Sequence, residues 1–223
     1  HMTRLTDSCR VEWKLLRLHG SEVGRILGLG VPAGIQHMIF AVANLFIQVG
    51  INSFDSTVVS GNSAAVNVDN VIYNVMAAFY TACSTFMGQN WGAGKKDRMM
   101  KSYYISLGYS FAIAAVLGAA FLLCGEPFLY IFTNDADVVA AGMERMRIMC
   151  FSYCVSAFMD CTIAACRGLG RSFVPTVIVI MGSCVFRVIW VYTIFAHFHT
   201  IPSLYLLYIF SWTITAAAEI LYF

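Results

Sequence analysis

Charged residues are scarce in this 223-residue chain: they make up 12% of it, whereas soluble domains carry about 25%. Because 59% of the residues are hydrophobic, a water-soluble fold of this size could not cover its surface with polar groups. The mean hydropathy of +0.72 is typical of a protein whose solvent is a lipid bilayer. The net charge of +2 is too small to indicate a nucleic-acid partner.

The sequence also lacks the common motifs of catalytic and cofactor sites. It contains no HExxH pair for zinc, no glycine-rich phosphate loop after a strand and no nucleophile elbow. Its eight cysteines lie mostly in apolar stretches, where cysteine behaves as a small hydrophobic residue. Cys150 and Cys154 share a helix face, but no histidine accompanies them. We therefore predict no enzymatic activity, no catalytic residues, no metal site and no organic cofactor.

Long stretches with few or no charges divide the chain into six segments. Each is long enough for a helix to cross a hydrocarbon core of about 30 Å, which needs about 20 residues. The segments do not show the apolar–polar alternation of barrel strands. The sequence predicts an all-α membrane protein with six transmembrane helices, near 27–50, 57–88, 102–124, 144–166, 174–196 and 203–223.

The segments that flank the six helices lie alternately on the two sides of the membrane. Basic residues are concentrated in the flanks of one side. Two of the 14 Lys and Arg residues, Arg145 and Arg147, lie at the predicted start of the fourth helix, and Arg187 lies inside the fifth. The rest precede the first helix or follow the second and fourth: Arg4, Arg10, Lys14, Arg17, Arg25, Lys95, Lys96, Arg98, Lys101, Arg167 and Arg171. By the positive-inside rule, we expect a multi-pass protein of the cell membrane with both termini in the cytoplasm.

The stretch GQNWGAGKKDR (88–98) lies where the second helix leaves the membrane. Gly92 and Gly94 can adopt the left-handed conformation that ends a helix, and the bases that follow can lie among anionic headgroups. The order of residues resembles the loop after the second helix of each half in the multidrug and toxic compound extrusion family. The stretches CRGLGRS (166–172), ILGLGVPAGIQ (26–36) and FRVIW (186–190) resemble that family's fourth loop, first helix and fifth helix.

The resemblance covers nearly the whole chain and implies one lobe of a twelve-helix, two-lobe transporter. The motifs look more like the family's C-terminal half, so residues 26–223 would form that six-helix lobe. Residues 1–25 would be a cloning scar and a basic cytoplasmic linker. Such transporters expel organic, often cationic, amphipathic drugs by antiport with H+ or Na+. The implied partners are these compounds, the bilayer and the N-terminal half. The alternative is a non-transporting bundle that acts only as a packing or assembly subunit.

Polar residues inside the predicted helices are the candidate functional residues, because each is costly in lipid unless it meets a partner or a water-filled path. The ion-coupling candidates are Asp160 and Asp69, because a carboxyl group in a low-dielectric site can exchange a proton or a sodium ion. The substrate-cleft candidates are Gln36, His37, Asn44, Gln48, Asn67, Asn70, Tyr73, Asn74, Tyr153, Ser156 and Arg187. For each of them, the alternative role is a hydrogen bond between helices.

Helical rise gives an expected depth for each charge. Asp160 lies about 10 Å from Arg167, and we expect Asp69 at a comparable level. We expect Arg187 in the other half of the membrane, bound to backbone carbonyls or extended to the membrane surface, and Glu219 at the interface. In some members of the family, acids on the first and fourth helices form a cation site. Residues 26–50 contain no acid, which argues against a sodium site of that kind.

Overall fold

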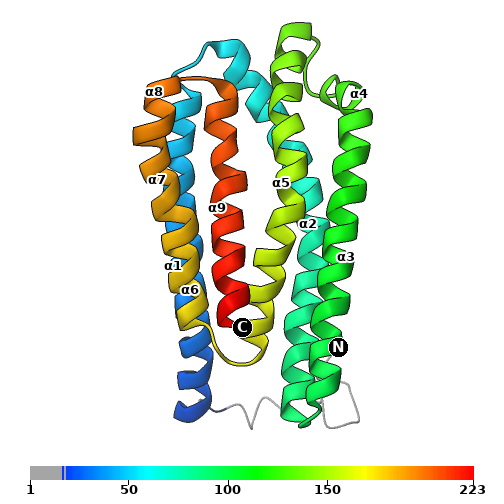
Figure 1. The fold of residues 1–223 in the computed structure, drawn as a ribbon, viewed down its shortest axis with the longest axis vertical. Coiled ribbons are helices and arrows are strands. Elements are labelled where there is room, and N and C mark those ends of the chain that lie inside the picture. Colours follow the sequence, from blue (N-terminus) through cyan, green and yellow to red (C-terminus); the bar gives the residue numbers. More distant parts are fainter. Residues whose placement is uncertain (1–16, 18) are drawn as a thin grey trace.

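The computed structural model describes residue 17 and residues 19–223, and the described part contains no strand. Six long helical rods dominate it (Figure 1). Five of them are α1 (Gly20–Ile51), α2 (Ser56–Gly92), α3 (Lys96–Leu123), α5 (Ala136–Gly168) and α9 (Ile201–Tyr222). The other rod consists of the consecutive segments α6 (Phe173–Val179), η3 (Ile180–Val185), α7 (Phe186–Trp190), η4 (Val191–Phe195) and α8 (Ala196–Phe198). A short helix, α4 (Gly125–Leu129), follows α3.

The six predicted helices are confirmed, and the structure changes their limits. The largest change is at α5, which begins at Ala136 rather than near residue 144. Asp135 caps this helix, because its side chain accepts a hydrogen bond from the backbone N–H of Asp137 at 2.9 Å. The predicted linker lies largely outside the described residues, with residues 1–16 and 18 not described.

Five of the six rods are long and apolar enough to cross a membrane by length and composition. The exception is α2, which contains Asp69 and several asparagines. These polar residues lower its mean hydropathy, although its 37 residues are ample for a crossing. The chain is a multi-pass membrane protein.

The connections of the bundle fall into two groups at opposite ends (Figure 1). One end carries the α2–α3 and α5–α6 connections with Lys95, Lys96 and Arg171, and we call it the basic end. Both of its turns use a glycine with positive φ, Gly94 at 69° and Gly170 at 79°. The prediction that glycine ends α2 is therefore confirmed for Gly94, whereas Gly92 is still helical.

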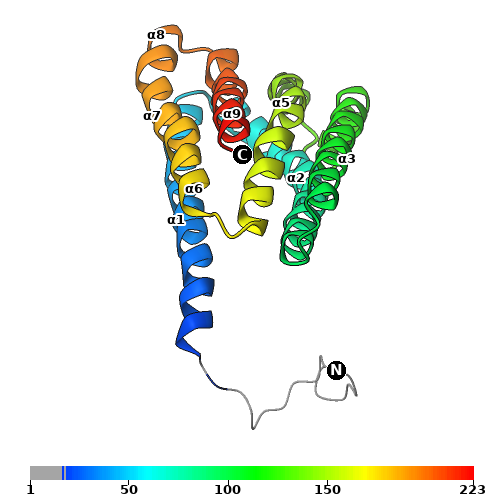
Figure 2. The same cartoon turned by 60° about the horizontal axis from the view of Figure 1, so that its bottom comes forward.

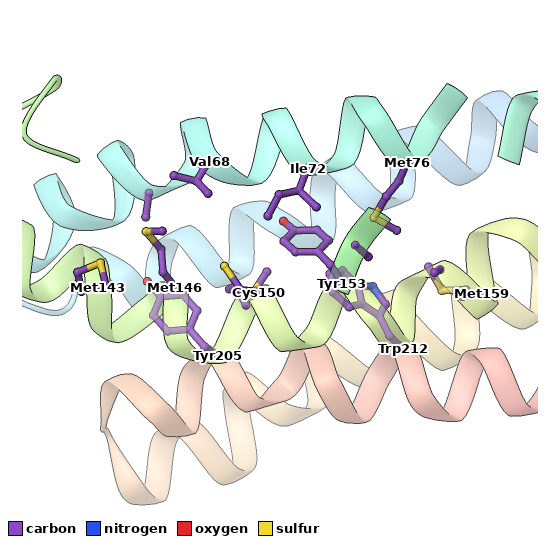
Figure 3. Close-up of a cluster of buried hydrophobic side chains, with 14 of the residues drawn as sticks. Val68, Ile72, Met76, Met143, Met146, Cys150, Tyr153, Met159, Tyr205 and Trp212 are labelled. Carbon is purple, nitrogen blue, oxygen red and sulfur yellow. The ribbon is translucent and has the colours of Figure 1, made fainter. Parts of the chain in front are cut away.

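The most buried rod is α5, which packs against α2, α3 and α9. Its apolar side chains form the main core with those of α2 and α9 (Figure 3). The helix α1 and the α6–α8 rod lie together on the other side of α9 (Figure 2). The labelled core residues are Val68, Ile72, Met76, Met143, Met146, Cys150, Tyr153, Met159, Tyr205 and Trp212.

Glycine permits a close approach of α2 to α5. A Cβ atom added to Gly61 would lie 2.7 Å from the carbonyl oxygen of Val138 and 2.8 Å from the backbone nitrogen of Gly142. Neither neighbour is a flexible side chain, so a larger residue could be accommodated only if the two helices separated.

We therefore expect Gly61→Val to lower the melting temperature of the purified protein in detergent by several degrees, since overpacking costs about 1–3 kcal/mol. The matched control is Gly108→Val on α3, because a Cβ atom at Gly108 meets nothing within 4 Å. Equal melting temperatures for the two variants would contradict the close α2–α5 contact.

Candidate functional site

A cavity of about 520 Å³ lies between α1, α2, α5, α7 and α9. It collects most of the predicted polar residues, namely Gln36, His37, Asn44, Gln48, Asp69, Asn70, Tyr73, Tyr153, Ser156, Asp160 and Arg187. Two candidates are outside it. Asn67 donates to the backbone carbonyls of Ser63 and Ala64, both at 3.3 Å, and Asn74 is exposed elsewhere on α2.

One face of α5 forms a wall of the cavity. Arg145, Met149, Tyr153, Ser156 and Asp160 follow one another at intervals of three or four residues and all line it. This regular spacing places a cation, an apolar side chain, two hydroxyl groups and an acid in one row. The wall can therefore contact both the apolar body and a polar group of an organic molecule.

A buried ion pair joins this wall to α2. The Nη2 atom of Arg145 donates to the Oδ2 atom of Asp69, and the two residues are 5% and 8% exposed. The Arg145 guanidinium also lies over the ring of Tyr205 on α9, 5.3 Å from its centroid. The prediction that placed Arg145 on a helix flank is wrong, because α5 begins earlier than its hydropathy indicates. Asp69 has a full counter-charge.

Arg187 is held in the cavity wall by neutral groups. Its Nε atom donates to the Oγ atom of Ser211 at 3.4 Å, and its Nη1 atom donates to the Oδ1 atom of Asn44 at 3.3 Å. Its guanidinium carbon lies over three aromatic rings, with centroid distances of 4.5 Å to Tyr208, 5.2 Å to Phe40 and 5.6 Å to Trp212. The predicted contact with backbone carbonyls or the membrane surface is wrong, since Arg187 is 2% exposed and bound by side chains.

Two π-helical segments, η3 and η4, flank the single α-helical turn that carries Arg187. Such segments are rare and occur often at functional sites. They change the direction in which the following side chains project, and here they bracket the one charged residue of the α6–α8 rod.

Asp160 is half-buried and lines the cavity, and within the described part of the chain its carboxylate has neither an ion pair nor a hydrogen-bond partner. Arg167 lies two turns further along α5, on the same face. The expected common depth of the two aspartates is wrong. Asp69 pairs with Arg145, and Asp160 lies 15 residues beyond Arg145, about 22 Å along α5 by helical rise.

The sequence analysis missed several residues that line the cavity. On α9, Tyr205, Tyr208 and Trp212 line the cavity at helical spacing, and the Tyr205 hydroxyl donates to the Oδ1 atom of Asn62 at 2.9 Å. The i, i+3, i+7 spacing of these aromatic residues could have identified this face. Glu219 on α9 is completely buried, and its expected place at the membrane interface stays a prediction.

The family model described as MatE matches residues 32–193 of this chain. The chain belongs to the MatE family. The MatE match includes most of the cavity wall, from Gln36 on α1 to Arg187 on α7. The members of this family are transporters rather than enzymes.

Curated relatives of this MatE chain include the probable multidrug resistance protein YpnP of Bacillus subtilis (strain 168). It is 31% identical over 132 residues, which cover 59% of this chain and 30% of YpnP. A probable multidrug resistance protein NorM of Photorhabdus laumondii is 23% identical, over 68% of this chain and 33% of NorM. A third relative is the FAD transporter of Shewanella oneidensis, 23% identical over 61% of this chain and 29% of its own.

Solved structures share the fold of this MatE chain. A MOP-superfamily transporter from Pyrococcus furiosus superposes with a TM-score of 0.84 at 17% identity, covering 95% of this chain and 48% of that one. The MATE transporter ClbM superposes with a TM-score of 0.81 at 21% identity, covering 89% of this chain and 46% of that one. The chain spans about a third of the length of the curated relatives it matches and about half of these structures.

The buried pair between Asp69 and Arg145 predicts a specific stability pattern. Asp69→Asn should destabilise the purified protein in detergent, because it leaves the Arg145 charge buried without a counter-charge at a cost of about 3–5 kcal/mol. The double variant Asp69→Asn, Arg145→Met removes both charges and should regain most of the lost melting temperature. A double variant less stable than Asp69→Asn alone would contradict this account.

Proposed function

We propose that this MatE chain is one lobe of an antiporter that expels organic, often cationic, amphipathic compounds in exchange for H+ or Na+. In this proposal a second six-helix lobe faces the cavity and completes the binding site. The two lobes alternate between an inward-open and an outward-open arrangement. The proposal also has both termini in the cytoplasm, so that the basic end faces the cytoplasmic headgroups.

The single observation that carries the proposal is the unpaired carboxylate of Asp160 in the wall of an amphipathic cavity. Asp69 and Arg145 neutralise each other, and Arg187 is surrounded by neutral and aromatic groups. Asp160 is therefore the acid of this cavity that is free to bind a cation. A proton, a sodium ion and an organic ammonium group would all compete for the same carboxylate, and such competition is the basis of antiport.

The aromatic part of the cavity supports an organic substrate. Phe40, Tyr73, Tyr153, Tyr208 and Trp212 line the cavity beside the polar groups, and aromatic side chains can bind both apolar bodies and organic cations. The names of the relatives extend from multidrug resistance proteins to an FAD transporter. A broad class of amphipathic substrates therefore agrees with the cavity better than one dedicated metabolite.

The orientation predicts a labelling pattern in the complete transporter made cysteine-free. A cysteine introduced at Lys96 should react only with reagent that reaches the cytoplasm, and one introduced at Ala136 should react from outside the cell. Both positions are exposed at opposite ends of the bundle. Labelling of both positions from the same side would contradict the six-helix topology.

The role of Asp160 predicts the effect of Asp160→Asn in the complete transporter. Because this change keeps the shape of the side chain but removes its titration, the variant should reach the membrane normally and lose most of its ion-driven efflux, by about tenfold or more. The measurement is efflux of a fluorescent organic cation from vesicles with an imposed proton or sodium gradient.

The matched control for this experiment is Asp97→Asn on α3, whose carboxylate is exposed at the basic end. This control variant should transport normally. If Asp160→Asn also transports at the wild-type rate with unchanged pH and sodium dependence, the coupling site lies elsewhere. If no variant and no wild-type protein transports, the alternative of a packing or assembly subunit replaces the proposal.

A further inference from the structure

Glu219 is a buried acid that the cavity does not use. It lies on α9 and is completely buried, and neither of its two carboxylate oxygens has a hydrogen-bond partner. It is absent from the cavity wall, which includes Asp69 and Asp160. An ionised carboxylate in this position would lose its hydration without gaining a compensating hydrogen bond. Such a position favours the neutral form of the carboxyl group, which carries a proton.

The groups that face Glu219 include one cation. On α5 these are Arg167, whose charge acts on the carboxyl group, and Cys166 beside it. On the α6–α8 rod, residues 173–185 contain no acid, base or histidine. Thr176 of that rod has a buried hydroxyl group that also lacks a partner. No group of three or more potential metal ligands occurs among the described residues, so a proton suits this site better than a metal ion.

Arg167 is only partly bonded in this conformation. Its Nη2 atom donates to the Oε1 atom of Gln36 on α1 at 3.0 Å, and its Nε atom is buried without a partner. Its charge acts on both Asp160 and Glu219, although it forms an ion pair with neither. The side chain therefore links α5 to α1 and has no ion-pair partner among the described residues.

We propose that Glu219 is a second proton-binding site of this lobe, and that loss of its proton draws Arg167 from Gln36 into an ion pair with Glu219. The proton moves from the Glu219 carboxyl group to water, and Arg167 remains charged throughout. Proton binding on α9 then controls the contact between α5 and α1. This inference goes beyond the proposed function, because it requires neither a substrate nor the exchange reaction.

Infrared difference spectroscopy of the complete protein in lipid bilayers, between acidic and alkaline pH, tests the proton site. Glu219→Gln should remove one component of the absorption band of buried protonated carboxyl groups. The matched control Glu126→Gln changes an exposed acid on α4 and should leave that band unchanged. A band that Glu219→Gln does not alter, or that titrates only when sodium is present, would overturn the proposal.

Hydrogen–deuterium exchange of α1 tests the switch, with variants compared at the same alkaline pH. Around Gln36, the wild type should exchange about tenfold faster than Glu219→Gln, as expected for the loss of a hydrogen bond from a charged donor. Gln36→Leu removes the acceptor and should make this exchange insensitive to Glu219→Gln. Gln36→Leu also provides a test if Glu219→Gln does not fold. In Gln36→Leu, the protection of the α1 amides, measured relative to their intrinsic exchange rates, should no longer depend on pH.

Equal exchange in the wild type and Glu219→Gln would contradict the switch. So would protection of the α1 amides in Gln36→Leu that depends on pH as it does in the wild type. Neither the infrared nor the exchange measurement depends on transport. A failure here therefore leaves the proposed antiport intact, and a failure of antiport leaves these two readouts interpretable.

Discussion

The buried ion pair between Asp69 and Arg145 is the interaction on which the arrangement of the site depends. It fixes α2 against the buried face of α5, and the same Arg145 guanidinium reaches over Tyr205 on α9. Because the pair is buried, removal of one partner leaves the charge of the other without compensation in the core. By neutralising each other, the two residues also leave Asp160 as the acid of the cavity that can respond to a cation.

The surroundings of the other interior charges reflect the same constraint. Each charge in the bundle interior requires groups that compensate for the loss of water. Arg187 obtains it from three aromatic rings and two neutral acceptors. Arg167 obtains part of it from Gln36, and it forms an ion pair with neither Asp160 nor Glu219. Asp69 is thus paired in this conformation, whereas Asp160 in the cavity wall and Glu219 on α9 have no ion-pair partner among the described residues.

The six helices were predictable because apolar runs of the required length are unambiguous, and most of the predicted polar residues of α1, α2 and α5 line one cavity. The position of Arg145 was not predictable from hydropathy, because α5 continues through a polar stretch that Asp135 caps. The burial of Glu219 was not predictable either, since distance from the end of a helix says nothing of what packs against it. Both features depend on tertiary contacts, which hydropathy along the chain does not reveal.

The central claim is that a proton and an organic cation compete for Asp160. Calorimetry of the complete protein in lipid nanodiscs, titrated with an organic cation in buffers of different ionisation enthalpy, measures the protons released on binding. The account predicts that binding releases protons near neutral pH, that affinity falls as the pH is lowered, and that Asp160→Asn abolishes both effects. Binding that releases no proton and has the same affinity across this pH range would contradict it.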